Sequence, residues 1–190
     1  MAEQQTQTAT AKVKRGAKKG FFEVRTPLTA TKIQLYGYSI DELNGKVVKL
    51  DLTRSLKGKN FELRLKAVKK DDYLEAKPIS LELIGSYIRR MMRPGIDYVE
   101  DSFIAEMKDG KARVKIFMIS RNKVSRAVRK ELRNNARKFL EGHLKTRTGE
   151  EAFTEIITNK MQKELFLKSK KIYPLALCEV RVFELVNEKK

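Results

Sequence analysis

Residues 97–143 decide the fold, because DYVEDSFIAEMKDGKARVKIFMIS (97–120) runs directly into RNKVSRAVRKELRNNARKFLEGH (121–143). The first stretch carries β-type patterns on both sides of Asp109-Gly110, which predicts strands at 97–107 and 112–120 joined by a tight turn. In the second stretch apolar residues recur every three to four positions, which predicts a long helix from Asn122 to His143. A β-hairpin that leads into a helix predicts an α+β fold.

Short segments with the period of a strand precede this hairpin, and turn residues separate them. The clearest is Asn60 to Lys66, in which Phe61, Leu63 and Leu65 fall on one face and charged side chains on the other, as in a half-buried strand. We expect strands at 21–25, 32–38, 46–52 and 61–68.

Two further helices and a last strand complete the predicted elements. A helix after Pro78 is indicated by the spacing of four apolar residues, with Ser80 as N-cap and Pro94-Gly95 as the stop: Leu81, Ile84, Ile88 and Met91. A third helix is expected from Thr148 to Lys171, with inward residues Phe153, Ile156, Ile157, Met161 and Leu165. The last strand is expected from Leu175 to Val186.

The predicted elements are thus several short strands and about three helices. Residues 21–187 are expected to form a single domain, with 188–190 as a short tail. Residues 1–20 are polar and basic and contain one valine, so we expect an N-terminal arm that is disordered when free. The arm is expected to bind an anionic partner through its cations.

Composition leaves few parts for an enzyme. The chain has one histidine, His143, and one cysteine, Cys178, which exclude a His/Cys zinc site and an internal disulfide. His143 is expected to interact with a helix C-terminus rather than act as a general base, and Cys178 to be a buried apolar residue. No phosphate loop or dinucleotide fingerprint occurs. We therefore expect no catalytic residue, no metal and no cofactor.

Net charge points to an anionic partner. Lys and Arg total 42 against 24 for Asp and Glu, a formal charge of +18. No apolar run is long enough to cross a membrane and no signal peptide pattern is present, so we expect a cytoplasmic protein.

The charge is concentrated on the helix at 122–143. Its predicted apolar stripe is Val124, Val128, Leu132, Ala136 and Phe139. On the opposite side we expect five cations: Arg126, Arg129, Lys130, Arg133 and Arg137. Because Glu131 and Glu141 are the only acids of this segment, ion pairs cannot neutralise that side. The pattern favours a phosphate-binding surface over a merely solvated face.

RNA is the anionic partner that remains by exclusion. The apolar stripe suits a domain core better than a membrane, and no helix-turn-helix, zinc or basic-zipper module is present for DNA. Four tyrosines could stack on bases, although buried or half-buried strand tyrosines are the commoner case and no stacking platform is evident from the pattern: Tyr36, Tyr38, Tyr87 and Tyr98. An RNA-processing enzyme or an architectural nucleic-acid-binding protein with the same basic surface stays an alternative.

Several motifs occur in a specific order along residues 20–186. They are Phe21-Phe22-Glu23-Val24-Arg25-Thr26-Pro27, Leu56-Lys57-Gly58-Lys59-Asn60-Phe61-Glu62-Leu63, the Asp109-Gly110 hairpin leading to Arg121-Asn122-Lys123, the basic helix, and Lys171-Ile172-Tyr173-Pro174-Leu175. In these motifs the chain resembles the S-three-a-e (eS-one) family of small ribosomal subunit proteins. Phe21, Phe22 and Thr26 depart from the Trp-Tyr and Ala usual in that family. The short C-terminus resembles the archaeal form.

The resemblance implies an α+β fold with a small, mixed or antiparallel, β-barrel-like core and about three flanking helices. It also implies a structural, non-enzymatic ribosomal protein in the cytoplasm, bound to 16S-type rRNA on the platform of the 30S subunit near the mRNA exit. It also implies neighbouring platform proteins as partners, and mRNA near the exit channel. The candidate RNA-binding residues are Lys12, Lys14, Arg15, Lys18, Lys19, Lys57, Lys59, Arg121, Lys123, Arg126, Arg129, Lys130, Arg133, Arg137 and Lys138.

Overall fold

A computed structural model describes residues 18–29, 31–56, 59–71 and 73–186. In these residues the chain folds into two compact units. The first comprises the described residues up to Lys46 together with Lys66–Lys77, and the second comprises Val47–Leu65 together with the residues from Pro78 onward. Each unit is described by itself.

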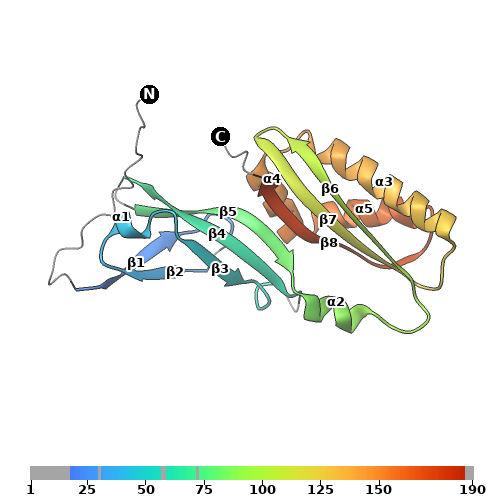
Figure 1. Cartoon of the computed structure of the whole chain (residues 1–190), viewed down its shortest axis with the longest axis horizontal. Coiled ribbons are helices and arrows are strands. Elements are labelled where there is room, and N and C mark those ends of the chain that lie inside the picture. The colour runs from blue at the N-terminus through green and yellow to red at the C-terminus, as the bar shows by residue number, and fades with distance from the viewer. Residues whose placement is uncertain (1–17, 30, 57–58, 72, 187–190) are drawn as a thin grey trace, which may run out of the picture. The chain divides into compact units, whose positions relative to one another are not determined.

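Eight strands and five helices form the described part of the chain (Figure 1). The strands are β1 (Gly20–Arg25), β2 (Ile33–Gly37), β3 (Val47–Asp51), β4 (Phe61–Lys70), β5 (Tyr73–Leu83), β6 (Tyr98–Met107), β7 (Gly110–Ser120) and β8 (Leu175–Val186). The helices are α1 (Ile40–Leu43), α2 (Gly85–Met91), α3 (Arg126–Leu144), α4 (Gly149–Ile157) and α5 (Lys160–Lys170). Strand pairing follows the order β2-β1-β5-β8-β7-β6, with β4 beside β5 and β3 beside β4.

The first unit is built on the hairpin of β1 and β2. These strands pair antiparallel from Gly20 opposite Gly37 to Val24 opposite Ile33, and β1 also pairs in parallel with β5 at Val24 and Leu74. Val24, Ile33 and Leu74 are buried, so one face of the hairpin forms the core of this unit. Because side chains alternate along a strand, the residues next to Val24 in β1 and next to Ile33 in β2 point to the opposite face of the hairpin.

The second unit contains the predicted hairpin, β6 and β7. The pairs run from Met107 opposite Gly110 to Tyr98 opposite Ile119. Gly110 has φ 147°, a conformation that side chains rarely adopt, which explains the glycine after Asp109. β8 pairs antiparallel with the other edge of β7, and with β5 at Leu81.

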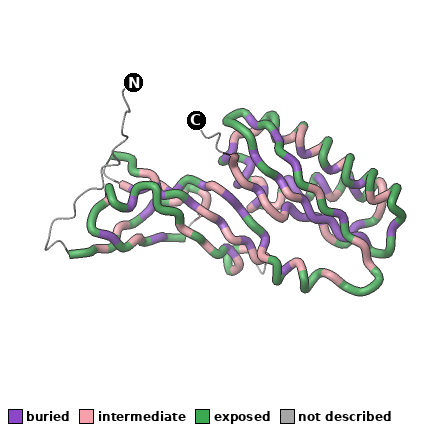
Figure 2. The backbone as a smooth tube through the Cα atoms, in the orientation of Figure 1, coloured by how far each residue is buried: buried purple, intermediate pink, exposed green. Residues whose placement is uncertain are grey.

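Three helices pack against this part of the sheet: α3 against β6, and α4 and α5 against β8 (Figure 1). Buried residues line β7 and much of β8 and the inner sides of the helices (Figure 2). Phe153 of α4 meets Phe183 of β8 edge to face, with ring centroids 4.9 Å apart. Burial of each such side chain contributes about 1.5–3 kcal/mol, so this layer holds the helices in place.

The α+β fold predicted from the sequence is confirmed, and the observed strands begin and end within two residues of most predicted bounds. β8 has the predicted bounds, Leu175–Val186. In α3 the stripe is confirmed at Leu132 and Ala136 and continues through Leu140 and Leu144.

The helix predicted to begin after Ser80 starts later. Residues 73–83 form strand β5, and α2 begins only at Gly85, with Ile84 as its N-cap residue. Ser80 pairs with Glu184 of β8 and is buried in the sheet, so it is not a helix cap. Leu81 and Leu83 are buried on either side of the exposed Glu82, a period of two that the spacing of Leu81 and Ile84 concealed.

The third predicted helix is two helices. α4 ends at Ile157 and α5 begins at Lys160, because Asn159 between them has φ 61° and ψ 16°. A left-handed residue breaks the helical hydrogen-bond ladder, and asparagine tolerates this conformation better than most other residues. Four of the five predicted inward residues are buried: Phe153, Ile156, Met161 and Leu165.

Candidate nucleic-acid interface

The start of α3 is held by the residue that precedes β6. Asp97 Oδ2 accepts a hydrogen bond from Val124 N at 2.8 Å, and Asp97 N donates to Ser120 Oγ at 3.1 Å. Ser125 is the N-cap, and its Oγ accepts from Val128 N at 3.4 Å. These bonds fix the loop between β7 and α3, and with it the position of the first turns of α3.

A groove lies between the first half of α3 and the start of β6. Its volume is about 410 Å³, and it is lined by Tyr98, Arg126, Arg129, Lys130, Arg133 and Asn134. Of these six described residues four are cationic and none is acidic. We call these residues the basic groove. Its only aromatic residue, Tyr98, is 50% exposed.

The cations of the basic groove are not neutralised within the described residues. Arg126, Arg129, Lys130 and Arg133 form no ion pair with any acid that the structure describes. Like charges three and four residues apart on a helix repel one another, by about 0.2–0.5 kcal/mol per pair. The groove therefore concentrates positive charge that a bound anion would neutralise.

Four of the five predicted cations are exposed on α3, but they do not all lie directly opposite the apolar stripe. Arg133 follows the buried Leu132 by one residue and so lies about 100° from it, not 180°. Arg129 is half-buried. The Arg137 guanidinium lies 5.5 Å from the centre of the Phe103 ring of β6 and pairs with Glu141, Nε to Oε1 at 2.9 Å. The basic side of α3 thus borders β6, which creates the groove.

Other predicted residues lie around α3. Arg121 and Lys123 are exposed in the loop before the helix, and Arg121 N donates to Pro174 O at 3.3 Å. Lys138 is exposed and lines a second hollow together with Lys130. The structure therefore gathers the predicted helix cations and the loop cations at one end of the second unit.

The predicted arm lies mostly outside the described residues, which begin at Lys18. Lys12, Lys14 and Arg15 are not described, and neither is Lys57. Lys18 and Lys19 are exposed, and the Lys19 ammonium lies 4.9 Å from the centre of the Tyr38 ring.

Lys59 has a partner inside the second unit. Its Nζ lies 2.6 Å from Glu179 Oε1 and 2.8 Å from Asn159 Oδ1. The Glu179 side chain is only 5% exposed. Burial raises the pKa of Glu179, while Lys59 opposes that rise. The Lys59 ammonium therefore neutralises a buried carboxylate, and an RNA contact from it stays a prediction.

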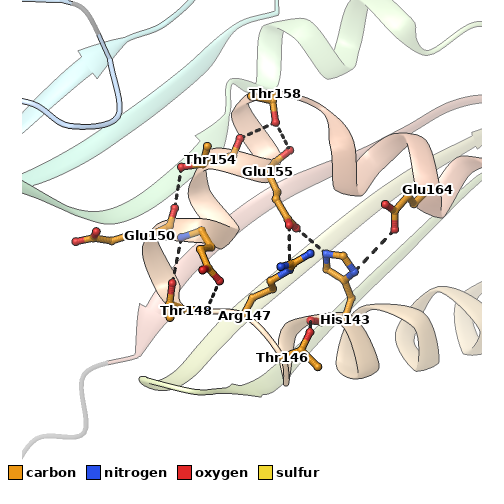
Figure 3. Close-up of polar contacts among 10 residues, drawn as sticks. His143, Thr146, Arg147, Thr148, Glu150, Thr154, Glu155, Thr158 and Glu164 are labelled. Atoms are coloured by element: carbon orange, nitrogen blue, oxygen red, sulfur yellow. Dashed lines mark hydrogen bonds and ion pairs between the residues drawn. The ribbon is translucent and has the colours of Figure 1, made fainter.

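His143 lies in a polar cluster where α3, α4 and α5 meet (Figure 3). Its Nε2 is 2.6 Å from Glu155 Oε2, and its Nδ1 is 3.9 Å from Glu164 Oε2. Arg147 Nε lies 3.0 Å from the other oxygen of Glu155. No described serine, threonine or cysteine side chain hydrogen-bonds to the His143 ring, so the cluster joins three helices and lacks the nucleophile of a hydrolytic site.

Cys178 is buried in β8, and burial raises the pKa of its thiol to about 12. A thiol that stays protonated is a poor nucleophile and a poor metal ligand. Among the described residues no group of three or more His, Cys, Asp and Glu side chains could hold a metal ion. None of the helices in this part of the chain has the length and apolar character needed to span a membrane.

Sequence reasoning missed two members of the basic groove, Tyr98 and Asn134. Asn134 follows Arg133 and has no charge to mark it. The sequence indicates that Tyr98 could stack on a base, but it does not place this residue beside the cations of α3, and burial within the sheet is the commoner position for a strand tyrosine. The feature that marks Tyr98 for exposure is its position: it follows Asp97 directly and is the first residue of β6, which lies at the edge of the sheet.

The fold and the groove define a class: an α+β protein with a basic surface beside α3. The chain belongs to the Ribosomal S3Ae family, which it matches over residues 7–189. It is 26% identical over 183 residues to the small ribosomal subunit protein eS1 of Nanoarchaeum equitans, with 91% of each chain covered. It is 31% identical over 103 residues to the protein of the same name from Methanothermobacter thermautotrophicus, covering 54% of this chain and 53% of the relative.

Proposed function

We propose that this ribosomal protein of the S3Ae family binds 16S rRNA at the platform of the small subunit, near the mRNA exit, through the basic groove. Family membership supports a structural rather than an enzymatic role in the ribosome. The names of the two archaeal relatives support the small subunit, and with it the cytoplasm, as its place of action.

The four unpaired cations of the basic groove carry the proposal. RNA phosphates would replace the missing counter-charges, and the release of condensed cations from RNA would favour binding. Three of the four are arginines, whose planar guanidinium groups can donate two parallel hydrogen bonds to one phosphate. The basic groove thus offers the RNA backbone a positively charged surface that no acidic side chain lines.

Tyr98 adds a second kind of contact to the same groove. Its half-exposed ring stands beside Arg126 and Arg129 at the groove wall. An unpaired base can stack on such a ring while its phosphates contact the arginines. Asn134 supplies donors and an acceptor within the same hollow.

The remaining partners follow from the same role. Arg121, Lys123 and Lys138 extend the positive surface around α3 and would contact neighbouring phosphates. The basic N-terminal segment would bind rRNA or a neighbouring platform protein, and mRNA would pass near the exit channel.

Charge reversal at Arg126, Lys130 and Arg133 tests the proposal. These three side chains are exposed, whereas Arg129 is half-buried and Arg137 contacts Phe103. The variant R126E/K130E/R133E is expected to fold and to lose binding to an rRNA transcript of the platform. The matched control is K160E/K163E/K170E, which makes the same change of charge at exposed positions of α5.

Wild-type affinity in the α3 variant would overturn the groove proposal. Equal loss of affinity in the α3 and α5 variants would show that binding depends on net charge and not on the basic groove. Two further measurements separate the alternatives. Duplex DNA that competes as well as rRNA at fixed salt would favour an architectural protein. RNA cleavage that depends on magnesium would favour a processing enzyme.

A further inference from the structure

Three aromatic rings and one ammonium group lie exposed on the first unit, at the hairpin of β1 and β2. Phe21 is 72% exposed, Tyr36 56% and Tyr38 37%. Phe21 and Tyr36 are direct cross-strand partners, and their ring centroids are 5.0 Å apart at an interplanar angle of 46°. The Lys19 ammonium lies 5.7 Å from the Tyr36 ring centre and 4.9 Å from that of Tyr38. We call these four residues the aromatic cluster.

The rings of the aromatic cluster are not needed for the core of the unit. The alternate residues of the same strands face inward, where Val24 and Ile33 are buried. An aromatic ring that stays in water does not contribute the free energy of apolar burial to folding. An exposed patch of such rings is typical of a binding site. The register of the hairpin thus presents Phe21 and Tyr36 to solvent.

The apolar part of this face is small and has polar neighbours. The next cross-strand pair on the same face is Glu23 opposite Gln34. Two residues further along β1, the Arg25 guanidinium lies 4.5 Å from the centre of the Tyr73 ring. An apolar surface of another protein would contact one pair of rings and beyond it only polar side chains, so this face is a poor match for such a partner.

The cations select the partner. Lys19 lies next to the rings, Lys18 precedes it and is exposed, and the sequence before them adds Lys12, Lys14 and Arg15. A partner that presents flat aromatic faces together with negative charges satisfies both features. Bases of single-stranded RNA can stack on exposed rings while phosphates contact the lysines, but bases within a duplex are already stacked on each other.

We propose that the aromatic cluster binds unpaired RNA nucleotides by stacking bases on Phe21 and Tyr36 and holding a phosphate at Lys19. This inference rests on the proposed function, because it assigns a second RNA contact to the same protein. Its main chemistry differs from that of the basic groove. Two rings and one ammonium favour stacked, unpaired bases, whereas the four cations of the groove bind any phosphate backbone and Tyr98 adds a single ring to them. It also gives a role to Phe21, the first residue of the motif at 21–27.

Two RNA probes and three double variants of the full chain test the inference. The probes are a fluorescein-labelled uridine decamer and a blunt RNA duplex of equal length. F21A/Y36A is expected to bind the decamer about tenfold or more weakly and the duplex unchanged. F21W/Y36F keeps two ring faces and is expected to keep decamer affinity. F21L/Y36L keeps apolar side chains without ring faces and is expected to lose it.

The outcomes separate this inference from the proposed function. Wild-type decamer affinity in F21A/Y36A or in F21L/Y36L overturns stacking, even if R126E/K130E/R133E loses RNA binding and so supports the groove. A wild-type chain that binds neither probe nor platform rRNA overturns both. Loss of contact with a platform protein in F21A/Y36A, with decamer binding intact, would assign the aromatic cluster to protein instead and overturn the inference.

Discussion

Val124 N donates a 2.8 Å hydrogen bond to Asp97 Oδ2 and so joins two residues that lie 27 positions apart. The bond fixes both walls of the basic groove, because Tyr98 directly follows Asp97 and Arg126 lies two residues after Val124. Val124 is only 9% exposed, so little water can replace the carboxylate as its acceptor. One hydrogen bond between strand and loop therefore holds an aromatic ring beside the cations.

Asp97→Ala is expected to destabilise the fold by about 1–3 kcal/mol, because it leaves the Val124 amide without an acceptor. It should also weaken rRNA binding, since Arg126 is no longer held beside Tyr98. Urea unfolding and an rRNA titration measure the two effects. Asp97→Asn keeps an oxygen acceptor and is expected to lose less in both.

Glu106→Ala is the control for Asp97→Ala. Glu106 is an exposed acid of β6, the strand that begins directly after Asp97, and its removal changes the net charge equally. If the two variants unfold at the same urea concentration, the bond to Val124 contributes no measurable stability and the anchor role of Asp97 is wrong.

Local patterns predicted most of the fold, because strands and helices with one buried face show it in their periodicity. The stretch from Phe61 to Leu65 and the stripe at Leu132 and Ala136 are of this kind. Prediction failed where two periods overlap, as at Leu81 and Ile84, where tertiary pairing with β8 selects the strand. The break at Asn159 also escaped, because one left-handed residue leaves no periodic signal.

Gly37→Ala is expected to destabilise the first unit by about 1–3 kcal/mol through overpacking. A Cβ at this position would lie 2.8 Å from Leu43 Cδ2, and Leu43 is 1% exposed, so it has little room to move. Gly20→Ala is the matched control on the paired strand, since, apart from its chain neighbours, no heavy atom of the described residues lies within 4 Å of its Cβ position. Thermal unfolding compares the two variants, and equal midpoints would show that Leu43 can adjust.

The candidate site could be predicted in composition but not in geometry. Arg126, Lys130 and Arg133 stand out in the sequence, because acids are scarce around them. The groove itself depends on Tyr98, which only the packing of α3 on β6 brings beside them. The partnership of Lys59 with Glu179 joins residues 120 positions apart, and no local pattern reports it.

Glu179 is expected to make the stability depend on pH. Burial raises the pKa of Glu179 above the ordinary value of 4.5. Between that value and the pKa in the folded chain, the folded state keeps a proton that the unfolded state has lost. Its contribution to the free energy of unfolding is complete below that value and falls as pH rises through the folded pKa. Glu179→Gln removes the titration. The stability of the wild type relative to this variant should therefore fall as pH increases from the ordinary value of 4.5 through the raised pKa of the folded chain. A constant difference would contradict the raised pKa.

Lys59→Met removes the partner of the buried carboxylate. Loss of one member of a buried ion pair costs about 3–5 kcal/mol, and the 24% exposure of the Lys59 side chain places the expected loss at or below the lower end of that range. Arg113→Met is the control, because Arg113 and Glu184 form an exposed pair at 3.6 Å, for which about 1 kcal/mol or less is expected. Urea unfolding at neutral pH should rank the two losses in this order; equal losses would show that burial adds nothing to the Lys59 pair.

Neutralisation of the basic groove is expected to change the salt dependence of rRNA binding. Each cation in contact with a phosphate contributes about 0.7–0.9 to the slope of log K against log salt, so R126Q/K130Q/R133Q should reduce its magnitude by about 2–3. Thermal stability should not fall, because the substitutions remove repulsion between like charges on one helix. K160Q/K163Q/K170Q lowers the net charge equally on α5 and should leave the slope unchanged. Parallel lines for wild type and the α3 variant would mean that these three side chains meet no phosphate, and the surface that binds RNA would then have to be sought elsewhere on the chain.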